Sequence, residues 1–148
     1  MSGTKVKRVG IVGCGVMRSG IAQVVAAAGY SVYVSDETGE ALEQGLDSIR
    51  SSLARDVEKG CSSREEADET LGRIARGADL EGHAEADLVI EAVFENLSVK
   101  KNLFGRLDLI CKPDALFATN TSSLCVTEMA AATSRPSRVV GMHFFNPA

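Results

Sequence analysis

Two glycines, Gly13 and Gly15, stand between a short apolar run and a segment with helical periodicity. Residues 6–12 are typical of a buried strand, because their side chains are mostly apolar on both faces. Apolar side chains then recur at helical spacing over residues 16–28, which predicts a helix. A strand, a tight glycine turn and a helix in this order predict the first unit of a parallel sheet with crossover helices.

The same alternation continues to the end of the 148 residues, and we expect them to form one domain. Further strands are predicted at residues 31–35, 78–80, 87–93, 115–118 and 139–144. Further helices are predicted at residues 38–59, 63–76, 96–111 and 126–132. The fold class is therefore α/β, a doubly wound and mostly parallel sheet, with a helical hairpin inserted after the second strand.

The glycine turn also predicts a ligand. Gly13 allows the tight turn, Gly15 lets a diphosphate approach the backbone, and the helix that follows offers unpaired N–H groups. Asp36, 21 residues after Gly15, ends the second strand, where an acid accepts hydrogen bonds from a ribose 2′-OH. This is the fingerprint of a Rossmann domain for NAD, since a carboxylate repels the 2′-phosphate of NADP. The cofactor-binding residues predicted at this end are Gly13, Gly15, Val16, Met17 and Asp36.

Arg18 departs from the fingerprint, which requires Gly or Ala at this position. A long side chain here has three possible consequences. It pushes the helix off the strand, it projects into the phosphate channel, or it pairs with the diphosphate. Overpacking of this kind costs about 1–3 kcal/mol.

Composition excludes several classes of function. The net charge is −4 and no long basic tract occurs, which argues against nucleic acid as a partner. The four cysteines form no C-x-x-C pair and the two histidines are far apart, so we expect no metal site. No apolar run is long enough to span a membrane and no signal peptide is evident, so we expect a cytoplasmic protein.

Four motifs carry a resemblance to a known family. They are residues 20–24, residues 91–97 with Glu-Asn-Leu, residues 118–124 with Asn-Thr-Ser-Ser-Leu, and residues 141–147 with His-Phe-Phe-Asn-Pro. Their order and spacing resemble the 3-hydroxyacyl-CoA dehydrogenases, including the short-chain 3-hydroxybutyryl-CoA dehydrogenases. The resemblance implies NAD-dependent interconversion of (S)-3-hydroxyacyl-CoA and 3-oxoacyl-CoA in fatty acid metabolism, with an acyl-CoA as the substrate.

The resemblance also assigns site residues. His143 matches the family's general base, Ser122 the serine that bonds the substrate oxygen, and Asn146 a supporting residue of the catalytic motif. The nicotinamide end of the cofactor matches Glu95, Lys100 and Asn120, and the contacts with coenzyme A match Ser52 and Lys59. Simpler roles stay open for some of them, because Ser122 is also placed to cap the next helix and Lys59 to end a solvated one.

In the family, the histidine pairs with a glutamate on the next strand, and a helical C-terminal domain supplies the acyl pocket and most of a homodimer interface. Neither lies within the 148 residues. We therefore expect this domain alone to bind NAD weakly and to turn over poorly or not at all. Two alternatives remain open. One is a relative acting on another 3-hydroxy acid, and the other is a non-catalytic nucleotide-binding, acyl-CoA-binding or structural module whose cofactor loop is impaired by Arg18.

Overall fold

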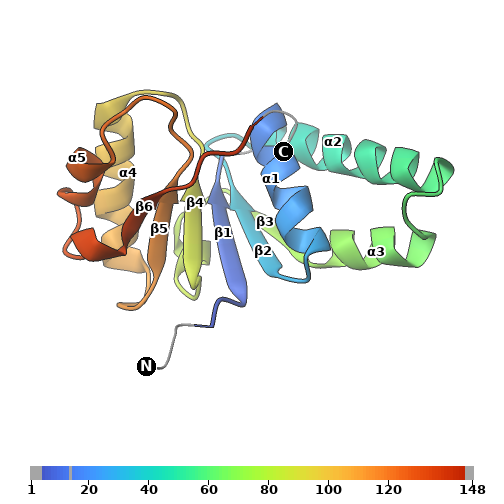
Figure 1. The fold of residues 1–148 in the computed structure, drawn as a ribbon, viewed down its shortest axis with the longest axis horizontal. Helices are drawn as coiled ribbons and strands as arrows, with labels where there is room; N and C mark the ends of the chain where they lie inside the picture. The colour runs from blue at the N-terminus through green and yellow to red at the C-terminus, as the bar shows by residue number, and fades with distance from the viewer. Residues whose placement is uncertain (1–4, 14, 146–148) are drawn as a thin grey trace.

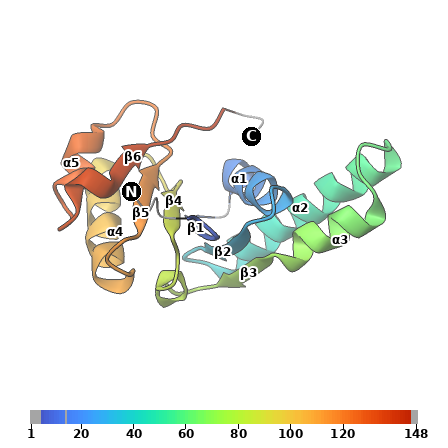
Figure 2. The ribbon, with the colours of Figure 1, turned by 60° about the horizontal axis from the view of Figure 1, so that its bottom comes forward.

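The computed structural model describes residues 5–13 and 15–145, which form a six-stranded sheet with helices on both faces (Figures 1 and 2). All strand pairs are parallel, in the order β3-β2-β1-β4-β5-β6. One half of the sheet holds β1 (Arg8–Val12), β2 (Ser31–Ser35) and β3 (Ile74–Gly77). The other half holds β4 (Leu88–Glu91), β5 (Leu116–Thr119) and β6 (Val139–Gly141). The predicted doubly wound sheet is confirmed, and its strand order reverses between β1 and β4.

The central strands β1 and β4 are apolar on both faces because each face packs against helices. On β1, Val9 and Ile11 belong to one hydrophobic cluster, while Val12 belongs to the other. Successive side chains of a strand point to opposite faces, so the two clusters lie on opposite sides of the sheet. The first is covered by α1 (Val16–Ala27), α2 (Gly39–Glu58) and α3 (Arg64–Gly72), and the second by α4 (Leu97–Ile110) and α5 (Val126–Ala130).

The inserted hairpin consists of α2 and α3 and projects from one side of the sheet (Figure 1). The Thr38 side chain caps α2 by accepting a hydrogen bond from the Ala41 amide at 3.2 Å. At the start of α3, Ser63 and Glu66 form the reciprocal capping box that their spacing predicts. The hairpin is therefore confirmed.

The prediction for the segment after the hairpin is wrong in two respects. Helix α3 ends at Gly72 rather than at residue 76, and the next strand is Ile74–Gly77 rather than residues 78–80. Register with β2 explains the difference, because Val32 donates its amide hydrogen to the Arg73 carbonyl and Ile74 lies opposite Val32. The residues that follow bend instead, since the Asp79 carboxylate accepts a hydrogen bond from the Gly82 amide. Two short 3₁₀ turns also lie in the connections: Glu81–His83 between β3 and β4, and Pro136–Arg138 between α5 and β6.

Candidate functional site

The turn after β1 has the geometry that its glycines predict. Gly13 adopts φ +106°, a conformation that side chains rarely tolerate, and its amide donates a 2.6 Å hydrogen bond to the Ser35 carbonyl. A Cβ on Gly13 would also lie 3.2 Å from the Ala92 carbonyl oxygen. Gly15 is the residue before α1 and brings no capping side chain. Two glycines at the switch point of the sheet, followed by the N-terminus of a helix, suit the close approach of a diphosphate.

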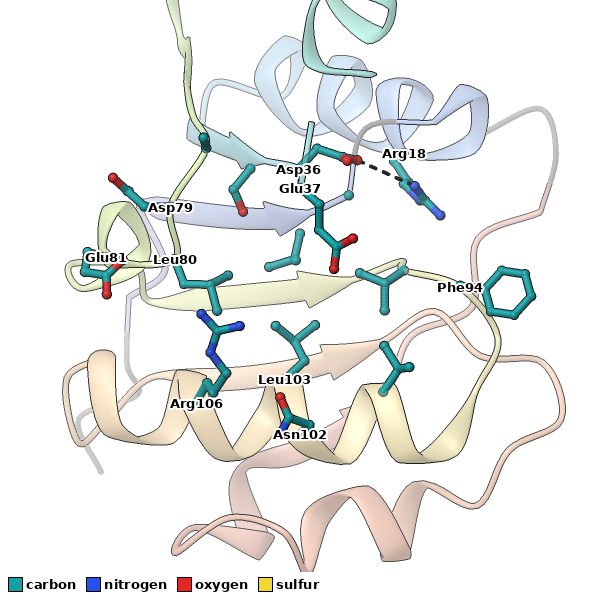
Figure 3. Close-up of a pocket in the computed structure, with 16 residues that line it drawn as sticks. Arg18, Asp36, Glu37, Asp79, Leu80, Glu81, Phe94, Asn102, Leu103 and Arg106 are labelled. Atoms are coloured by element: carbon teal, nitrogen blue, oxygen red, sulfur yellow. Dashed lines mark ion pairs between the residues drawn. The ribbon is translucent and has the colours of Figure 1, made fainter. Parts of the chain in front are cut away.

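Arg18 crosses this turn. The helix is not displaced by the side chain, because Ile21, Ala22 and Ala26 on its inner face are fully buried. The guanidinium instead reaches Asp36, with Nη1 lying 3.7 Å from Oδ2 (Figure 3). Of the three consequences expected for Arg18, the structure shows projection into the phosphate channel.

A cavity of about 610 Å³ opens beside this ion pair, within the size range of small-molecule sites. Its walls come from the ends of β1 and β2, from residues 78–81 after β3, from the loop after β4 and from α4. Its apolar wall includes Val99. Leu80 and Leu103 belong to the same wall (Figure 3). Gly13 and Asp36, the predicted diphosphate and ribose contacts, both line this cavity.

A buried charge cluster lies at the ends of β4 and β5. Lys100 of α4 is 1% exposed, and its ammonium lies 2.9 Å from Glu91 Oε1 and 3.1 Å from Glu95 Oε2. Glu91 is fully buried and also accepts a 2.6 Å hydrogen bond from the Thr119 hydroxyl. The Thr121 hydroxyl donates to Glu95. Because every carboxylate here has partners, the cluster fixes the loop between β4 and α4.

Glu95 is the partly exposed member of this cluster, with 44% of its side chain accessible. Partial burial raises its pKa, but hydrogen bonds from Thr121 and Lys100 and the charges of Lys100 and His143 outweigh this, so the pKa lies below its usual value. Glu95 therefore presents a carboxylate that stays ionised beside His143.

The segment after β6 runs over the carboxyl edge of the sheet toward α1 (Figure 1). The Asn120 side chain holds it, because Oδ1 accepts a 2.7 Å hydrogen bond from the Phe144 amide. His143 is exposed, its ring centroid lies 4.7 Å from that of Phe145, and no hydrogen bond from a described residue reaches its imidazole. The structure thus brings His143, Asn120, Glu95 and Lys100 to one edge.

Ser122 is exposed in the loop after β5 and does not cap the next helix. The residue before α5 is Cys125, which makes no side-chain capping bond, so the capping role considered for Ser122 is wrong. Thr121 orders this loop instead by accepting hydrogen bonds from the Ser123 and Leu124 amides. Ser122 is left with an exposed side chain in this loop.

Other predicted residues lie apart from the cavity or outside the described part of the chain. Ser52 is partly buried on α2 and Lys59 is exposed at its end, and neither lines the cavity. The side chains of Val16 and Met17, and all of Asn146, lie outside the described residues. The simpler role of Lys59, a solvated helix end, matches its place after Glu58.

Sequence reasoning missed Glu91, Thr119 and Thr121. Glu91 ends a buried apolar strand, and a charged residue at such a position indicates a buried carboxylate with a partner. Within the described ranges, no group of three or more His, Cys, Asp or Glu side chains is arranged to hold a metal ion. In the same residues, no helix has the length and apolar character needed to cross a membrane.

A parallel sheet with a glycine turn at its switch point and an acid at the end of the next strand defines a dinucleotide-binding domain of the Rossmann class. Residues 8–148 match the family model described as the NAD binding domain of 3-hydroxyacyl-CoA dehydrogenase. The chain belongs to this family, and the cofactor of its domain is NAD.

Relatives agree with this assignment. The chain is 47% identical over 143 residues to a probable 3-hydroxybutyryl-CoA dehydrogenase of Bacillus subtilis, covering 97% of this chain and 50% of the relative. It is 44% identical to a 3-hydroxyadipyl-CoA dehydrogenase of Escherichia coli, covering 97% of this chain and 30% of the relative. The crystal structure of an (S)-3-hydroxybutyryl-CoA dehydrogenase from Ralstonia eutropha superposes with a TM-score of 0.94 at 38% identity, covering 97% of this chain and 50% of that one. The chain thus spans about half the length of such relatives, or less.

Proposed function

We propose that this chain is the cofactor-binding part of an NAD-dependent dehydrogenase that interconverts (S)-3-hydroxyacyl-CoA and 3-oxoacyl-CoA. One observation carries the proposal: the glycine turn and Asp36 at one end of the carboxyl edge share that edge with His143 and Asn120 at the other. A dinucleotide lying along this edge places its adenosine in the cavity and its nicotinamide toward the imidazole.

Each residue then has a defined task. His143 takes the proton of the substrate hydroxyl, and Ser122 bonds the same oxygen as it becomes a carbonyl. Bound NAD supplies the acceptor for the hydride that leaves the substrate carbon. Asn120 holds the backbone next to His143, and Glu95 with Lys100 forms the charged floor at the nicotinamide end. A supporting role for Asn146 and coenzyme A contacts by Ser52 and Lys59 remain predictions, as do a homodimeric whole enzyme and a cytoplasmic location.

The domain alone is proposed to bind NADH without measurable turnover. Histidine is an efficient general base only when a hydrogen-bonding partner orients it, and among the described residues no carboxylate hydrogen-bonds to the His143 imidazole. Fluorescence titration of the 148-residue chain with NADH is expected to give weak but saturable binding. Robust acetoacetyl-CoA reduction by this chain would refute its proposed inactivity.

A second candidate is a non-catalytic module, and the Arg18–Asp36 ion pair favours it by filling the cofactor channel. The same titration separates the two candidates. No binding at millimolar NADH, by a chain that circular dichroism shows to be folded, would support the non-catalytic module.

A further inference from the structure

The Arg18 side chain lies directly on the glycine turn. A Cβ built on Gly13 would meet Arg18 Cδ at 2.6 Å and Nε at 2.8 Å, and one on Gly15 would lie 3.4 Å from Nη1. These distances show that the arginine stem uses the space that the two glycines leave open. That is the space in which a diphosphate approaches the backbone of a Rossmann turn.

The guanidinium also contacts Asp36, the residue proposed to bind the ribose. Its Nη1 lies 3.7 Å from Asp36 Oδ2, and the two side chains are 28% and 13% exposed (Figure 3). Asp36 is the carboxylate placed to accept the ribose hydroxyl. A single side chain therefore covers the diphosphate position and contacts the carboxylate of the ribose position.

We propose that Arg18 is a built-in occupant of the dinucleotide site, which NAD(H) has to displace before it binds. The inference rests on the proposed function and deepens it, because it makes Arg18 the residue that sets cofactor affinity. Binding breaks the Arg18–Asp36 contact and moves the stem off Gly13. The ion pair is partly shielded from solvent, so breaking it costs free energy, and so does reordering a long side chain. Together these two costs weaken NADH binding about tenfold.

The experiment compares NADH dissociation constants, measured by fluorescence at one ionic strength, for the 148-residue chain and two variants. Arg18→Gly is expected to bind NADH about tenfold more tightly. Arg50→Met is the matched control, because it removes one positive charge from an exposed site on α2 outside the cavity. Its dissociation constant is expected to equal that of the unchanged chain.

A third variant separates the ion pair from the bulk of the side chain. Arg18→Met keeps a long stem but loses the charge, and it is expected to bind NADH with an affinity between those of the chain and Arg18→Gly.

Two results overturn the proposal in different ways. If the chain binds NADH and Arg18→Gly binds it equally or more weakly, Arg18 is not a competing occupant, although the proposed function stands. If the folded chain and folded Arg18→Gly both fail to bind at millimolar NADH, the proposed function itself fails and the inference falls with it.

Discussion

Acid should destabilise this domain through one buried histidine, His83. Its side chain is fully buried, its Nε2 shares a 2.7 Å hydrogen bond with the Ser35 hydroxyl, and its ring lies edge-on to Tyr33. A Cβ on Gly10 would come within 2.2 Å of Nδ1, so the ring rests against the β1 backbone. Among the described residues Nδ1 has no hydrogen-bond partner, and a proton added there finds no acceptor.

Burial lowers the pKa of His83 from 6.5 to about 4, although the nearby charge of Asp79 opposes the change. The unfolded chain therefore binds a proton below pH 6.5 that the folded chain refuses until about pH 4. Stability is full above pH 6.5 and falls as the pH drops through this window. Because one pKa unit is worth about 1.4 kcal/mol, the total loss is about 3 kcal/mol.

Urea unfolding followed by circular dichroism measures this loss between pH 7 and about pH 4. His83→Gln cannot take up the proton, so its unfolding free energy is expected to change about 3 kcal/mol less over the window. His143→Gln is the matched control, since it removes the other, exposed histidine and should retain the loss of stability that buried His83 causes in this window. Asp87 does not interfere. Burial raises its pKa, but hydrogen bonds from Lys112 and two backbone amides outweigh this and lower the pKa from 3.8 to about 2. Protonation of Asp87 therefore reduces stability mainly below the pH window of His83. Equal slopes for the chain and His83→Gln would refute the reasoning.

Three further predictions concern stability, each measured by urea unfolding at neutral pH. Gly10→Ala should cost at least about 1–3 kcal/mol because the methyl group meets His83, and it should cost far less in a His83→Ala background; equal costs in both backgrounds would contradict this. Glu91→Gln should cost about 3 kcal/mol, since Lys100 stays buried and, among the described residues, keeps only Glu95 as an ionic partner. A neutral effect would show that the cluster is not maintained by charge. Arg135→Ala should cost about 3 kcal/mol, because the guanidinium donates hydrogen bonds to the Asp108 carboxylate at 2.6 Å and to three backbone carbonyls at the end of α4 and just after it. A loss below about 1 kcal/mol would contradict that estimate.

Local sequence signals predicted the fold well, because the elements carry their own periodicity and α2 and α3 their own side-chain caps. The capping box at Ser63 and the glycine turn at Gly13 involve residues a few positions apart, so spacing alone indicates them. β3 was misplaced because its start depends on register with β2, a strand about 40 residues earlier. Local pattern contains no information about that pairing.

The candidate site was predicted in its outline but not in its connections. Motifs located His143, Glu95 and Lys100, whereas the role of Glu91 depends on contacts with α4 and β5. The Arg18–Asp36 ion pair shows the same limit, since the departure at position 18 was visible in the sequence but its partner was not. Which group a long side chain reaches is decided by tertiary geometry.

A crystal structure of the chain grown with saturating NADH tests most directly whether the edge after β1 is a cofactor site. We expect the diphosphate to lie on the amides after Gly13, with Arg18 moved off Asp36 and the nicotinamide ring directed toward His143. Density for the Arg18–Asp36 ion pair across an otherwise empty channel would contradict the assignment of this edge to NAD.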